Sequence, residues 1–180
     1  MNKKIYFDYA ATTPVDPEVE KAMRPYFGKI FGNPGSVHRF GQEASAAVFE
    51  ARQKVAKAIG ANYDEIIFTG SATEANNLAI RGIIKLIKEL RIIDNPRIIV
   101  SVIEHESVLE TARILEKEGV EVIYIPVSQE GIVDVKKIKE ALDENTILVS
   151  VMYANNEIGT IQPITEITRA ISEFKKSRNP

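Results

Sequence analysis

Short apolar runs alternate with longer segments of helical period along this chain. Apolar positions that recur every three or four residues indicate helices, whereas short runs rich in Ile and Val indicate strands. The runs predict strands over residues 65–69, 97–103, 121–125 and 146–152. All but the third are nearly continuous apolar strings, which is typical of strands buried on both faces of a parallel sheet.

The predicted helices lie between these runs and have recognisable ends. We expect them over residues 16–28, 42–59, 72–92, 107–119, 134–142 and 164–175. Asp16 followed by Pro17 is a typical helix start, and Gly60 is a typical residue just past a helix end. Ser107 with Glu110 three residues later predicts a capping box at the start of the fourth helix. Strands and helices in this alternating order predict an α/β fold with a mainly parallel sheet flanked by helices.

Composition narrows the classes of protein that the chain can belong to. With 180 residues, 44% of them hydrophobic, the chain is long enough for a real core, and one compact domain is the default expectation. The 25 acidic and 23 basic residues give a net charge of -2, so there is no basic excess of the kind that binds nucleic acid. Because the sequence has no cysteine, this polypeptide supplies no disulfide, zinc-thiolate or iron-sulfur ligand and no thiol nucleophile.

No apolar stretch approaches the roughly 20 residues needed to span a bilayer. Residues 1–7 hold too few apolar positions for a secretory signal. We therefore expect a soluble, cytoplasmic protein without membrane contact.

Three strand-to-helix junctions carry the candidate chemistry, because open parallel sheets bind ligands at the carboxyl ends of their strands. The first, residues 69–74, reads TGSATE. Its small and hydroxylated residues allow helix N–H groups to approach an anion, and phosphate is the obvious ligand. The alternative is that Ser71 or Thr73 only caps a helix that has Glu74 in its first turn.

The other two junctions contain a histidine and a pair of asparagines. His105 follows the strand predicted over residues 97–103 and could stack on a planar ligand or transfer protons, or it could simply begin a loop. Asn155 and Asn156 follow the last predicted strand and suit either a turn or a hydrogen bond to a polar ligand. His38, in a glycine-rich segment, is expected to be solvated. Together the three junctions predict a concave polar site at one edge of the sheet.

Five segments in this order resemble a known enzyme family. They read IYFDYAATTPVDPEV (5–19), GNPGSVHRFG (32–41), FTGSATEANN (68–77), EHESV (104–108) and NNEIG (155–159). They are similar to cysteine desulfurases of the NifS/IscS branch, which belong to the class V aminotransferase group of pyridoxal-phosphate enzymes. The resemblance implies the large domain of a PLP-dependent transferase of the aspartate aminotransferase type (fold type I), incomplete here. It also implies a homodimer that mobilises sulfur from L-cysteine for iron-sulfur clusters or tRNA thiolation.

The resemblance also assigns residues. It implies that Ala72 and Thr73 bind the phosphate of pyridoxal 5′-phosphate, that the catalytic residue His105 stacks on its ring and shuttles protons, and that Asn155 lies near the cofactor's phenolic oxygen and the substrate. No metal is implied. Two departures are visible, since Gly70-Ser71 reverses the usual order and Gly35 stands where serine is common. Residues 1–14 would contribute to the small domain, and residues 15–180 would form the N-terminal part of the cofactor-binding domain.

Members of this family are considerably longer than this chain. The lysine that binds the cofactor covalently and the cysteine that accepts sulfur would lie in a C-terminal half, so we expect the isolated chain to be inactive and to expose a large apolar surface. Sulfur acceptor or scaffold proteins are further expected partners. Two alternatives stay open: a non-catalytic regulator or scaffold that binds a desulfurase or a sulfur acceptor, and a selenocysteine lyase-like member of the group.

Overall fold

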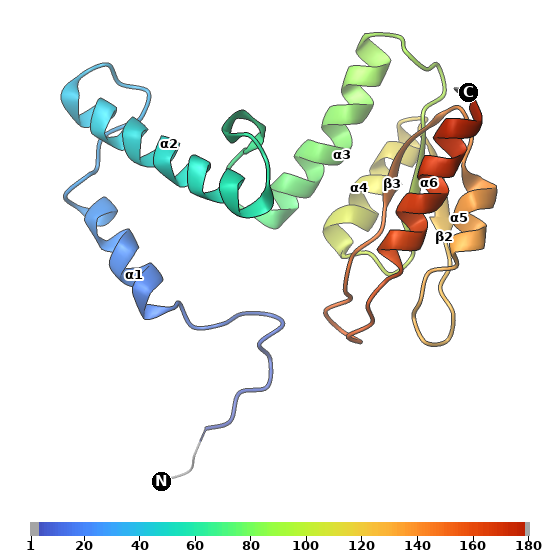
Figure 1. Cartoon of the computed structure of the whole chain (residues 1–180), viewed down its shortest axis with the longest axis horizontal. Helices are drawn as coiled ribbons and strands as arrows, with labels where there is room; N and C mark the ends of the chain where they lie inside the picture. Colours follow the sequence, from blue (N-terminus) through green and yellow to red (C-terminus); the bar gives the residue numbers. More distant parts are fainter. Residues whose placement is uncertain (1–3, 179–180) are drawn as a thin grey trace. The chain divides into compact units, whose positions relative to one another are not determined.

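The computed structural model describes residues 4–178, which form two compact units divided between Phe68 and Thr69 (Figure 1). This division corrects the expectation of one compact domain. The physical reason is that most large apolar side chains before residue 69 are exposed. The domain boundary expected after residue 14 rests on the resemblance and stays a prediction.

The first unit is helical. It contains α1 (Pro17–Met23), the short 3-10 helix η1 (Arg24–Phe27), the long α2 (Arg39–Ile59) and η2 (Tyr63–Glu65). Asp16 caps α1 as predicted, its carboxylate accepting from the N–H of Glu18 at 2.8 Å. Gly60 ends α2 with φ of 70°, a left-handed conformation that glycine adopts without steric cost.

The strand predicted over residues 65–69 is wrong. Glu65 belongs to η2, and residues 66–69 are not part of any strand. Ile67 and Phe68 are 68% and 49% exposed. A strand needs a hydrogen-bonded neighbour, and within the described residues none is paired with this segment.

The second unit is a three-layer α/β structure. Its strands are β1 (Arg97–Ser101), β2 (Glu121–Ile125) and β3 (Thr146–Ser150), all parallel in the order β2-β1-β3. Its helices are α3 (Ala72–Glu89), α4 (Glu106–Lys117), α5 (Val135–Ala141) and α6 (Ile164–Arg178). The predicted α/β class with a parallel sheet flanked by helices is therefore confirmed.

Each face of this sheet has its own core, because successive side chains of the central strand point to opposite faces. Ile98 and Val100 pack with buried residues of α3 and α4. Ile99 packs instead with Ile138 of α5 and Ile167 of α6. Figure 1 shows α5 and α6 side by side next to the strands.

Both histidines cap helices, which moves two helix starts from their predicted positions. His38 Nδ1 accepts from the N–H of Gly41 at 3.4 Å, so α2 begins at Arg39 rather than residue 42. His105 Nδ1 accepts from the N–H of Ser107 at 3.0 Å, so α4 begins at Glu106 and the predicted Ser107 cap is wrong. An imidazole nitrogen serves here as the acceptor that Ser, Thr, Asp or Asn usually provides.

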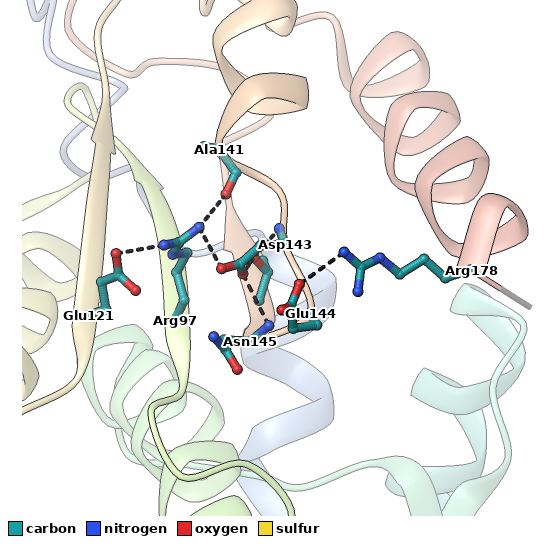
Figure 2. Close-up of polar contacts among 8 residues, drawn as sticks. Arg97, Glu121, Ala141, Asp143, Glu144, Asn145 and Arg178 are labelled. Atoms are coloured by element: carbon teal, nitrogen blue, oxygen red, sulfur yellow. Dashed lines mark hydrogen bonds and ion pairs between the residues drawn. The ribbon is translucent and has the colours of Figure 1, made fainter.

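An ion cluster holds the amino end of the sheet together (Figure 2). Arg97, at the start of β1, contacts Glu121 of β2 at 2.7 Å and Asp143, which precedes β3, at 2.8 Å. It also donates to the carbonyl of Ala141 at 3.0 Å. The hydrogen bond to Glu121, together with the charge of Asp143, raises the pKa of Arg97. An arginine is protonated at neutral pH in any case, so the cluster keeps its cation there. The cluster joins all three strands at the end of the sheet opposite to the candidate site.

None of the helices within residues 4–178 has both the length and the apolar character that a membrane span requires.

Candidate functional site

The carboxyl ends of β1 and β3 form one cleft that contains two of the predicted site residues. His105 and Asn155 both line it, and its volume is about 380 Å³. The remaining lining comes from the segments after the same two strands: Val102, Ile103, Glu104, Glu106, Leu109, Asn156, Glu157 and Ile158. The topology thus brings together residues that lie 50 positions apart in the sequence.

Asn155 forms a turn and also joins the two strand ends. Its Oδ1 accepts from the N–H groups of Glu157 at 2.8 Å and Ile158 at 3.0 Å, so the turn considered from the sequence is present. Its Nδ2 donates to the carbonyl of Ile103 at 3.1 Å. The side chain is therefore held in a fixed orientation at the cleft wall.

His105 is exposed and fixed at one nitrogen. Its Nδ1 accepts from the backbone of Ser107 and lies 2.9 Å from the Ser107 hydroxyl. Because Nδ1 acts as an acceptor, the neutral ring carries its proton on Nε2. The arrangement leaves Nε2 as the atom at which this side chain can exchange a proton with a ligand.

The start of α3 combines a helix cap with unpaired donors. Ser71 Oγ accepts from the N–H of Glu74 at 3.1 Å, so Ser71 is the cap and Thr73 is not. The carboxylate of Glu74 accepts from the N–H of Gly70 at 2.7 Å. The N–H groups of Ala72 and Thr73 belong to the first turn, where no intrahelical carbonyl reaches them, and both residues are exposed.

Two asparagines connect α3 to α4. Asn76 donates to the hydroxyl of Ser107 at 2.9 Å, and Asn77 accepts from the hydroxyl of Thr111 at 3.0 Å. These bonds bring the first turns of both helices to the same end of the unit. Ala72 and Thr73, however, are not among the residues that line the cleft of His105 and Asn155.

Sequence reasoning did not foresee the burial of two polar residues that shape this end of the sheet. Glu104 is 9% exposed and bonds to residues of β1 and to the segment after β3. Gln162 is 3% exposed, accepts from the N–H of Val133 at 2.8 Å and donates to the carbonyl of Gly131 at 2.8 Å. A polar residue directly after a buried strand is the available signal for Glu104, whereas nothing local distinguishes Gln162 from an exposed glutamine.

The residues present fit a phosphorylated planar cofactor. Free N–H groups at the start of an 18-residue helix, with the positive end of its dipole, can bind a phosphate, and the Thr73 hydroxyl can add a donor. The cleft supplies an imidazole and an amide for a polar ring. Within residues 4–178 no group of three or more His, Asp or Glu side chains is arranged to hold a metal ion.

Comparisons with known proteins give one consistent family. The Aminotransferase class-V family pattern matches residues 5–177. The chain is 50% identical over 174 residues to the cysteine desulfurase IscS of Dictyoglomus turgidum, covering 97% of this chain and 43% of that protein. It is 53% identical over 170 residues to the IscS of Rickettsia bellii, covering 94% of this chain and 40% of that protein. The chain thus spans less than half the length of these curated relatives.

Comparison with solved structures supports the same family. A NifS-like protein matches with a TM-score of 0.89 and 40% identity, over 95% of this chain and 46% of that chain. SspA, solved in complex with cysteine, matches with a TM-score of 0.85 and 38% identity, over 94% of this chain and 48% of that chain. The family pattern, which matches residues 5–177, includes the segments that carry the cleft and the start of α3.

Proposed function

The chain belongs to the Aminotransferase class-V family, and we propose that it is the N-terminal part of a pyridoxal 5′-phosphate-dependent cysteine desulfurase of the NifS/IscS type. The complete enzyme converts L-cysteine to L-alanine and retains the sulfur as a persulfide, for iron-sulfur cluster assembly or tRNA thiolation. The observation that carries the proposal is the joint presence of His105 and Asn155 in one cleft beside the exposed start of α3.

Each predicted residue has a role in holding the cofactor or moving a proton. The N–H groups of Ala72 and Thr73 bind the phosphate. His105 stacks on the ring and exchanges a proton at Nε2, since Nδ1 is used by the helix cap. Asn155 donates to the phenolic oxygen with the amide hydrogen that does not bond to Ile103, and this hydrogen exchanges its weak acceptor, Met152 Sδ at 3.3 Å, for the cofactor. When bound, the cofactor withdraws electrons from the α-carbon of the substrate.

The covalent steps require residues outside this chain. Because the sequence contains no cysteine, the persulfide forms on another segment. We place the lysine that binds the cofactor in the same C-terminal portion. The resemblance to the family supports this position, and the curated relatives extend well beyond the part that this chain covers. The isolated chain is therefore inactive. The assembled enzyme is a cytoplasmic homodimer that passes sulfur to acceptor or scaffold proteins.

A fusion tests this proposal. Residues 1–180 are joined to the C-terminal portion of the Dictyoglomus turgidum IscS protein that the chain does not cover. With pyridoxal phosphate present, we expect the fusion to release alanine from L-cysteine, whereas residues 1–180 alone release none. A fusion that binds the cofactor yet releases alanine only from L-selenocysteine would support the selenocysteine lyase alternative instead.

The exposed apolar side chains of the first unit favour one second candidate, a scaffold that binds a complete desulfurase. Gel filtration distinguishes the scaffold candidate from the half-enzyme proposal. The scaffold reading requires a stable complex of residues 1–180 with intact Dictyoglomus turgidum IscS, and the half-enzyme proposal requires that the isolated C-terminal portion binds more tightly.

A further inference from the structure

Glu104 is the only carboxylate among the buried polar side chains of residues 4–178, with 9% exposure. Burying a carboxylate is costly unless hydrogen-bond donors replace water. Its Oε1 accepts from the hydroxyl of Ser101 at 2.7 Å and from the N–H of Met152 at 2.5 Å. Its Oε2 lies 3.5 Å from the hydroxyl of Ser150. Glu104 therefore contacts both β1 and the chain that continues from β3.

These contacts begin where the backbone pairing of the two strands stops. The last register pair of β1 and β3 is Val100 with Ser150. Met152 lies two residues past that pair, and no ladder hydrogen bond holds it to β1. The carboxylate of Glu104 thus connects two segments that the sheet itself leaves unconnected.

The same segments carry the two cleft residues, and the contacts form a closed ring. Met152 donates to Glu104 through its N–H, and its Sδ accepts from Asn155 Nδ2 at 3.3 Å. Asn155 Nδ2 also donates to the carbonyl of Ile103, the residue before Glu104. His105, the residue after Glu104, caps α4. A shift of the Glu104 carboxylate would therefore move the backbone on both sides of the cleft.

We propose that Glu104 is a positioning residue that fixes His105 and Asn155 relative to each other for the chemistry at the cofactor. The role assigned to the two cleft residues rests on the proposed function, but the geometric coupling does not. Precise positioning of reacting groups has a large effect on rate, since a displacement of about 1 Å can cost a hundredfold.

Nuclear magnetic resonance of the 180-residue chain tests the coupling without any activity. The variants are Glu104→Ala, Glu104→Gln and, as a control on the exposed face of α4, Glu110→Gln. In Glu104→Ala we expect the Met152 amide to exchange with solvent about tenfold faster or more, because it loses its acceptor. The His105 ring signals and the Asn155 side-chain amide signals shift as well. Glu104→Gln keeps one acceptor oxygen and loses the other, so we expect the same signals to shift less than in Glu104→Ala but still away from their positions in Glu110→Gln. The test therefore stands even if the alanine variant does not fold.

A purely structural role gives another pattern. The melting temperature of Glu104→Gln would fall while the His105 and Asn155 signals stayed at their positions in Glu110→Gln, and this result would overturn the proposal.

The fusion enzyme provides the second arm. We expect Glu104→Ala to lower kcat for alanine formation about tenfold with KM for L-cysteine changed less than about threefold, and Glu104→Gln to recover part of the loss. Equal kcat values for Glu104→Ala and Glu110→Gln in an active fusion would contradict the inference. An inactive wild-type fusion would count against the proposed function, while the resonance data would still decide whether Glu104 positions the two residues.

Discussion

The two units differ in where their apolar side chains lie. Among the described residues, the buried hydrophobic side chains of the first unit are only Ala44 and Ala56, whereas the second unit buries Ile, Leu and Val on both faces of its sheet. The first unit exposes large side chains instead, including Phe7 at 92%, Phe27 at 77% and Phe31 at 69%. Local capping marks the starts of α1 and α2, but most helical stability comes from packing against a core, and a core needs partners from elsewhere. The second unit therefore has hydrophobic cores of its own, whereas the first unit exposes most of its large apolar side chains.

The largest expected effect comes from separating the units. Residues 69–180 should unfold in one cooperative urea transition, because both cores lie within them. Residues 1–68 should show helical circular dichroism without a cooperative transition and should bind a hydrophobic dye. A cooperative transition in residues 1–68 alone would remove the distinction between the units.

The next largest difference is expected between two side-chain truncations to alanine, one in each unit. Ile98→Ala, at a fully buried site of the second unit, should lower the free energy of unfolding by about 3 kcal/mol. Phe27→Ala removes a larger side chain that is 77% exposed and should change it by less than about 0.5 kcal/mol. Urea titrations of both variants measure this difference, and similar losses would mean that the first unit has a core after all.

Ion pairs provide a smaller contrast. Arg97→Ala should cost about 2 kcal/mol, because Glu121 and Asp143 lose a shared partner whose side chain is only 20% exposed. Lys21→Ala in α1 removes a 3.8 Å pair with Glu18 in which both side chains are more than three-quarters exposed, and it should have no measurable effect. Thermal unfolding followed by circular dichroism compares the two, and equal shifts in Tm would contradict the assigned difference.

The smallest effects come from two helix caps with the same chemistry. Asp134 caps α5 in the second unit and Asp16 caps α1 in the first. Asp134→Ala should lower the stability of the cooperative unit by about 1 kcal/mol. Asp16→Ala should reduce helical signal without moving that transition, and a shift of the transition would indicate that α1 belongs to the same cooperative body.

Sequence periodicity predicted best those helices and strands whose packing partners lie in the next segments of the same chain. The strand over residues 121–125 has its predicted bounds, and α3, α5 and α6 lie where their apolar spacing places them. Residues 65–69 carry an equally strong strand pattern and form no strand, because strand formation depends on a paired neighbour rather than on local composition. The sheet order β2-β1-β3 also depends on distant pairing.

The site was predictable in part for the same reason. That His105 and Asn155 meet in one cleft follows from their positions at the carboxyl ends of parallel strands. The capping role of both histidines was not predictable, because imidazole is an uncommon cap and the helix start depends on a single hydrogen bond. The burial of Glu104 depends on Met152, which lies 48 residues further along the chain.

The most direct test of the assigned function is the rate of alanine formation from L-cysteine by the fusion enzyme, measured before and after His105→Ala. We expect an active fusion and a loss of about a hundredfold or more in the variant, because a positioned proton-transfer group is removed. The melting temperature should fall only slightly, by the amount that loss of the α4 cap predicts. A fusion that binds pyridoxal phosphate but releases no alanine, or a His105→Ala variant as active as its parent, would contradict the account.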